Sequence, residues 1–134
     1  MKKTSKSEVK NLKNPKYVNI DQVIELVKSD TQIVVGSAAA EPREFVTNLH
    51  KAAGRVSNVT ITNCLPIADS KFFIDEEYRD NFFLDGWFYT GVLRKMHKHG
   101  NISFIPNNLH FAGSKRLAYR KVDMFVTAAS MPDK

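Results

Sequence analysis

Apolar side chains recur at helical spacing in the first third of the chain, which predicts two amphipathic helices. The first covers residues 21–28, with Asn19 or Asp21 as its N-cap, and its apolar face follows the offsets 0, 3, 4 and 7 from Ile20. The second begins at Pro42 and ends at Gly54, where we expect a left-handed conformation. Its apolar face comprises Phe45, Val46, Leu49, Ala52 and Ala53.

Short β-branched runs alternate with these helical patterns. Residues 32–36 (QIVVG) and 58–62 (NVTIT) are predicted strands, and the first lacks the polar alternation of a strand with one solvated face. A strand, helix, strand order implies a parallel pair joined by a right-handed crossover. The pattern therefore predicts a βαβ unit.

The same alternation continues to the C-terminal end of the sequence, after an irregular aromatic-rich region over residues 64–86. Within that region we expect a helical turn near 75–79 and a strand over 81–84. Further on, we expect a helix that starts near Tyr89 and ends at Gly100, a strand over 102–105, a helix over 108–120 and a strand over 122–128. The predicted fold class is α/β, an open, mainly parallel sheet with helices on both faces.

Composition and charge narrow the functions that a protein with this fold can have. The 134 residues carry a net charge of +6, but the first 16 alone contribute +5, so the positive charge belongs to an arm and not to the folded surface. We expect a basic arm over residues 1–18 and one α/β domain over 19–134. Nucleic-acid binding is not favoured. The single cysteine and the lack of a long apolar segment predict a cytoplasmic protein without membrane contact.

Ligands of open α/β sheets bind beyond the carboxyl ends of the strands, so the loops that follow the strands are the candidate ligand sites. The first loop contains Gly36, Ser37, Ala38, Glu41 and Pro42, whose small side chains would let an anion approach the start of the second helix. An alternative is that the alanines only permit tight packing and that Glu41 caps the helix.

Two further strand ends supply candidate residues. Cys64 and Leu65 follow the second strand, and Pro106, Asn107 and Asn108 follow the strand over 102–105. The alternatives are that Cys64 is a small buried side chain and that the two asparagines form a turn and an N-cap. The spacing of His97 and His99 does not suit a zinc site, and no histidine is placed to activate Ser130, so we predict no metal site and no catalytic triad.

Taken in order, these segments resemble the acetyl-CoA hydrolase/transferase family, which includes 4-hydroxybutyrate and butyrate coenzyme A transferases. The resemblance spans nearly the whole chain and depends on the series of segments, none of which is specific alone. The segments are Val34-Val35-Gly36 with Glu41-Pro42, Leu65-Pro66 with Phe72-Phe73, Phe82-Phe83 with Trp87-Phe88, Arg94-Lys95-Met96 with Gly100, Ser103 to Asn107 with Leu109-His110, and Asp123 to Val126 with Ser130 to Asp133.

The resemblance implies an N-terminal domain of a two-domain enzyme that moves coenzyme A, its substrate, between a short-chain acyl-CoA and a small carboxylate. In this family a glutamate of the second domain forms a glutamyl-CoA thioester. No glutamate of this chain matches that motif, so the chain would supply only part of the cleft wall, with a downstream C-terminal domain as its partner. Ser130-Met131-Pro132-Asp133 departs from the usual Ser-Pro-Met-Asp, which weakens any role for Ser130. A free-standing CoA- or anion-binding module, an inactive truncated fragment and a homo-oligomer remain open alternatives.

Overall fold

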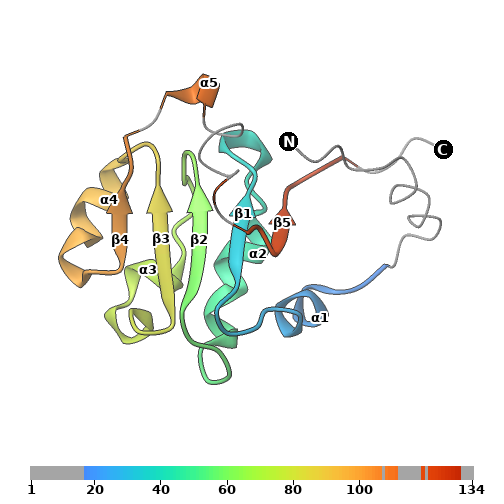
Figure 1. Ribbon diagram of the computed structural model, residues 1–134. Helices are drawn as coiled ribbons and strands as arrows, with labels where there is room; N and C mark the ends of the chain where they lie inside the picture. Colours follow the sequence, from blue (N-terminus) through green and yellow to red (C-terminus); the bar gives the residue numbers. More distant parts are fainter. Residues whose placement is uncertain (1–16, 107, 112–118, 120, 131–134) are drawn as a thin grey trace.

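The computed structural model of this protein describes residues 17–106, 108–111, 119 and 121–130, and these form an open five-stranded sheet (Figure 1). The strand order is β4-β3-β2-β1-β5, and every neighbouring pair is parallel. This confirms the predicted α/β class. The strands are β1 Gln32–Val35, β2 Val59–Asn63, β3 Phe82–Gly86, β4 Ile102–Phe104 and β5 Met124–Val126.

The connections between strands contain short helices, several of which continue as single 3-10 turns. Asn19 caps the first helix through a reciprocal pair of hydrogen bonds with Gln22, each 2.9 Å long. The predicted N-cap is therefore confirmed. The α-helices are α1 Ile20–Glu25, α2 Arg43–Asn48, α3 Lys71–Ile74, α4 Gly91–Met96 and α5 Leu109–Phe111; the 3-10 turns are η2 Ala38–Ala40, η3 Leu49–Ala52, η4 Glu76–Tyr78 and η5 His97–His99.

Helices α1 to α4 contribute side chains to a single core on one face of the sheet. Alternate strand residues such as Ile33, Ile61 and Leu84 point into this core and are almost completely buried. Leu93 of α4 lies against the same face beside Gly86. β1 to β4 step across the sheet in one direction (Figure 1), and successive right-handed crossovers in one direction place their helices on one face.

The opposite face of the sheet mixes polar and aromatic side chains. Ser103 donates a 2.6 Å hydrogen bond to Asp85, and Gln32 donates a 3.0 Å hydrogen bond to Thr62 across the sheet. At the edge strand, Phe125 is 64% exposed. The strands thus bury one continuous apolar face and hold the other by side-chain hydrogen bonds.

Several local predictions were wrong or lie outside the described residues. Pro42 is the N-cap of α2 and not its first helical residue. Gly54 does not adopt a positive φ; the left-handed residue before β2 is Asn58, at φ 54°. Gly100 does end its helix in the left-handed conformation, at φ 80°. The helix α3 was not predicted.

The C-terminal elements are shorter than the patterns suggested. Of the helix predicted over 108–120, the structure has α5 Leu109–Phe111, and residues 112–118 and 120 lie outside the described part. The last strand covers three residues rather than the predicted 122–128. Residues 1–16 of the predicted basic arm also lie outside the described part. Over the residues that are described, we find no helix with the length and apolar character needed to span a membrane.

Candidate functional site at the carboxyl edge

The parallel strands bring the loops that follow β2, β3 and β4 to one edge of the sheet, and there they enclose a pocket of about 490 Å³. Two of the predicted cleft residues, Leu65 and Pro106, line this pocket. Its other lining residues come from the β3–α4 connection, from α4 and from the end of β4: Trp87, Phe88, Tyr89, Thr90, Arg94 and Phe104.

Among the residues that the structure describes, Arg94 is the one charged side chain that lines this pocket. It lies in the last turn of α4, and its Nε donates a 3.1 Å hydrogen bond to the carbonyl oxygen of Tyr89. The ring of Tyr89 packs against that of Phe104, with centroids 5.4 Å apart, and against His97 at 5.5 Å. The aromatic side chains therefore form one wall, and the guanidinium is tied to the same loop.

Three polar atoms of the lining are buried and have no hydrogen-bond partner among the described residues. They are Nε1 of Trp87, the hydroxyl of Tyr89 and the hydroxyl of Thr90. Burial raises the pKa of the Tyr89 hydroxyl, although the nearby Arg94 acts in the opposite direction, so this group remains a protonated donor at neutral pH. Each unpartnered buried polar group costs about 1–3 kcal/mol. Three of the six such atoms found in the described residues thus belong to this pocket.

The predicted loop after β1 is closed by its own packing. A Cβ built on Gly36 would lie 2.5 Å from Oγ1 of Thr127 and closer still to the carbonyl oxygen of Ala40, so glycine is required there. That oxygen accepts hydrogen bonds from Thr127 Oγ1 (3.2 Å) and from the Ala128 amide (2.9 Å). Ala38 has a φ of 52°, and Ser37 is half-buried. The end of β5 therefore holds this loop.

Glu41 is buried, with 4% exposure, and joins two of the loops at the carboxyl edge. Its carboxylate accepts hydrogen bonds from Asn63 Nδ2 (2.9 Å), from the Ile67 amide (3.2 Å to each oxygen) and from the Ala68 amide (2.8 Å). The alternative reading of Glu41 as a helix cap is wrong, because α2 has no side-chain cap. The side chain instead caps the amides of the loop that follows β2.

The remaining predicted residues lie around this edge in different environments. Pro42 lines a second cavity, of about 310 Å³, with Arg43 and Thr127. Cys64 is half-buried, and its carbonyl oxygen accepts from the Phe88 amide at 2.9 Å. Asn108 is exposed, and its Oδ1 accepts from the His110 amide at 3.0 Å, as in the predicted turn. Asn107 lies outside the described residues.

Sequence reasoning missed the pocket residues of the β3–α4 connection and Arg94 as a lining residue. The predicted strand over 81–84 ended two residues before the observed β3, so residues 87–90 were not recognised as the loop at its carboxyl end. The signal was nonetheless present, because Trp87, Phe88 and Tyr89 form an aromatic run directly after an apolar strand.

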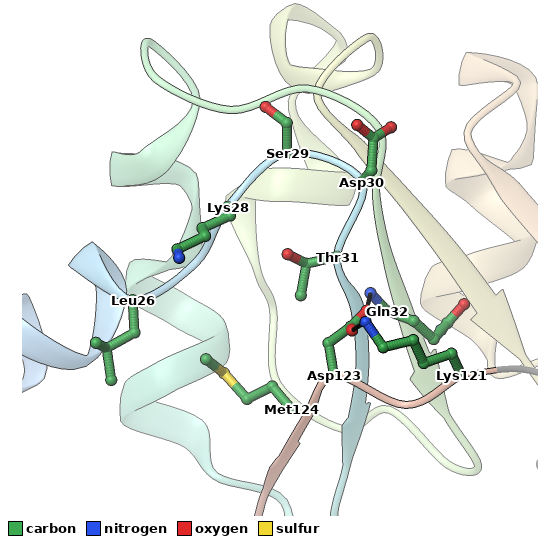
Figure 2. A pocket seen from close by; sticks show the side chains of 9 residues that line it. All are labelled: Leu26, Lys28, Ser29, Asp30, Thr31, Gln32, Lys121, Asp123 and Met124. Carbon is green, nitrogen blue, oxygen red and sulfur yellow. Dashed lines mark hydrogen bonds and ion pairs between the residues drawn. The ribbon is translucent and has the colours of Figure 1, made fainter.

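A third pocket, of about 590 Å³, lies at the opposite, amino edge of the sheet (Figure 2). Asp123 accepts a 3.0 Å hydrogen bond from the Gln32 amide and pairs with Lys121 at 2.7 Å. The Lys121 side chain and the Gln32 amide together hold the pKa of Asp123 below its usual value. The described residues contain no cluster of three His, Cys, Asp or Glu side chains that could hold a metal ion.

Comparisons with known proteins add one relationship, which is structural. No family model and no curated protein matches the sequence. The fold matches the crystal structure of RipA from Yersinia pestis with a TM-score of 0.72 and 19% sequence identity, over 82% of this chain and 28% of RipA. Two single-residue variants of RipA match with the same TM-score and identity, over 27% of their length. The chain thus shares its fold with somewhat more than a quarter of RipA.

Proposed function

We propose that this chain forms the N-terminal part of a coenzyme A transferase that moves CoA from a short-chain acyl-CoA to a carboxylate such as acetate. The observation that carries the proposal is the ordered series of sequence segments that resemble the acetyl-CoA hydrolase/transferase family. The match to RipA, a CoA-transferase-like protein, over 82% of this chain supports the fold that the resemblance implies. At 19% identity this match bears on the fold alone.

In the proposed reaction, a glutamate of a second domain attacks the thioester carbonyl, forms an acyl anhydride and releases the CoA thiolate. The thiolate then attacks the glutamyl carbonyl of the anhydride, which gives a glutamyl-CoA thioester and frees the first carboxylate. The acceptor carboxylate reverses these two steps and leaves as the new acyl-CoA. This is covalent catalysis by a carboxylate.

The part that this chain would play is to position the substrates, since no glutamate here takes the role of nucleophile. Glu41 is excluded by its surroundings as well as by the motif, because its carboxylate is buried among three donors. The carboxyl-edge pocket, with Leu65 and Pro106 in its lining, is the proposed contribution to the cleft. We propose a cytoplasmic location for this reaction.

The test is an exchange assay with butyryl-CoA and labelled acetate on the longest polypeptide that the reading frame encodes. We expect labelled acetyl-CoA, and borohydride reduction during turnover should alter the mass of a single glutamate outside residues 1–134. A polypeptide that carries a second domain but neither exchanges CoA nor traps such an adduct would contradict the proposal.

A second candidate is a binding module without turnover. It is favoured by one observation: the carboxyl-edge pocket of about 490 Å³ combines an arginine with exposed aromatic side chains, a lining suited to a small ligand. Thermal shifts with CoA, acetyl-CoA and butyrate discriminate, because a ligand that binds only the folded state raises its apparent stability. Stabilisation of the chain together with an inactive full-length product would favour the module.

A further inference from the structure

The charges around the carboxyl-edge pocket select the sign of its ligand. Within the described part of the chain, the lining contains Arg94 and no acidic side chain, whereas in the amino-edge pocket the lysines lie among Asp30 and Asp123. Among the described residues, Arg94 bonds only to the Tyr89 carbonyl oxygen, through its Nε, so its terminal nitrogens can still bind an anion. A guanidinium can donate two parallel hydrogen bonds to one carboxylate. One cation without a neighbouring acid favours a ligand with a single negative charge.

The rest of the lining selects an apolar body for that ligand. Phe88 is 50% exposed and Phe104 is 46% exposed, and both side chains belong to the pocket together with Leu65 and Pro106. Exposed aromatic surface beside a cavity is a common property of ligand sites. A volume of about 490 Å³ falls in the usual range for small-molecule pockets.

The unpartnered donors give the binding of a carboxylate an additional source of free energy. The Trp87 indole and the Tyr89 and Thr90 hydroxyls have no partner among the described residues, but each polar atom is buried, so it must turn toward the cavity before it can donate to a ligand. Thr90 precedes α4 and makes no side-chain cap, so rotation about χ1 turns its hydroxyl without loss of a hydrogen bond. A donor that gains its first partner relieves a desolvation penalty, while an already bonded donor only exchanges partners.

We propose that this pocket binds a monocarboxylic acid with a short aliphatic or aromatic body, its carboxylate on Arg94 and its body between Phe88 and Phe104. The inference rests on the proposed function only for the role of this acid as CoA acceptor. Recognition of the acid itself follows from the lining of the pocket.

Trp87 provides the measurement, because it is the single tryptophan of the chain and lines the pocket. We expect butyrate and benzoate to change its fluorescence in a saturable way, with a Kd on the order of 1 mM, as is typical of ligands of this size. The neutral isosteres butyramide and benzamide should bind at least about tenfold more weakly, because they cannot form the charge-assisted hydrogen bonds.

Substitution of Arg94 identifies the anchor. Arg94→Gln should weaken the binding of butyrate by about tenfold to a hundredfold. Arg94→Lys keeps the charge but loses the planar guanidinium, so its affinity for butyrate should lie between those of Arg94→Gln and the wild type. Arg79→Gln is the matched control, since Arg79 is exposed and pairs with Glu76 on η4, away from the pocket. Melting curves of all three variants establish that they fold.

The outcomes separate this inference from the proposed function. Acid binding that depends on Arg94, in a full-length product without CoA exchange, supports the pocket and refutes the transferase. CoA exchange with no fluorescence response to acids, or with the same affinity in folded Arg94→Gln, overturns the pocket and leaves the transferase intact. Equal affinity for butyrate and butyramide also overturns it.

Discussion

Glu41 and Asp123 lie at opposite edges of the same sheet, and both accept hydrogen bonds from backbone amides. Glu41 is 4% exposed and accepts from three donors at the end of β2 and in the loop that follows it. Asp123 accepts from one amide and pairs with Lys121, whose side chain is 88% exposed. The same contact, a carboxylate that accepts from a backbone amide, therefore joins two buried segments at one edge and lies at the solvent-exposed surface at the other. Burial decides which of the two matters for stability.

The most disruptive way to test this difference is Glu41→Ala. We expect it to lower the free energy of unfolding by about 3–5 kcal/mol, because it leaves the buried Asn63 side-chain amide and two partly buried backbone N–H groups without an acceptor. Urea denaturation measures the change. Glu41→Gln retains one acceptor oxygen, so its free energy of unfolding should lie between those of the wild type and Glu41→Ala. A loss below about 1 kcal/mol would mean that water replaces the carboxylate and that the junction is not truly buried.

A smaller effect is expected from Gly36→Ala, which tests how closely the loop after β1 approaches the end of β5. The added methyl group would collide with the Ala40 carbonyl oxygen and the Thr127 hydroxyl, and should cost about 1–3 kcal/mol of unfolding free energy. Gly54→Ala is the matched control, because a Cβ there meets nothing within 4 Å and the backbone has no positive φ. It should be neutral or slightly stabilising. Similar melting temperatures for the two variants would refute the close approach.

The smallest effect is expected from Asp123→Asn at the amino edge, and it should depend on pH. The pKa of Asp123 is lowered in the folded state, so its contribution to stability is complete above its unfolded pKa of about 3.9 and is lost as the pH falls through the folded value. The variant should have a lower free energy of unfolding than the wild type at neutral pH, and the same free energy of unfolding in acid. Urea titrations at both pH values, with and without added salt, measure this. A difference that persists in acid would contradict the assigned cause.

The elements that could be predicted are those that a short, continuous stretch of sequence specifies. β1 and β2 follow from β-branched runs, and Gly100 ends its helix because it occupies the left-handed position that glycine adopts without strain. At Gly54 the same rule failed, since the chain makes its left-handed turn later, at Asn58. Helix α3 has four residues, fewer than are needed to show a period, although Phe72 and Phe73 are both buried.

The candidate site was harder to predict because its contacts join distant parts of the sequence. Glu41 meets partners 22 to 27 residues away, so its role could not be seen from the helix that it precedes. Arg94 lines the pocket because the crossover to β4 returns it to the loop after β3. Leu65 and Pro106 were predicted because a general rule places ligands at the carboxyl ends of parallel strands, and the pocket lies there.

The strand order also sets an order of events during folding. β1 to β4 are neighbours in sequence as well as in the sheet, but β5 reaches β1 across 91 residues, as the hydrogen bond between Gln32 and Asp123 shows. Closing the longer loop costs more chain entropy before any contact forms. β5 should therefore dock last and detach first, with its amides the earliest of the sheet to exchange with deuterium. The loop after β1, which the end of β5 holds in place, would open with it.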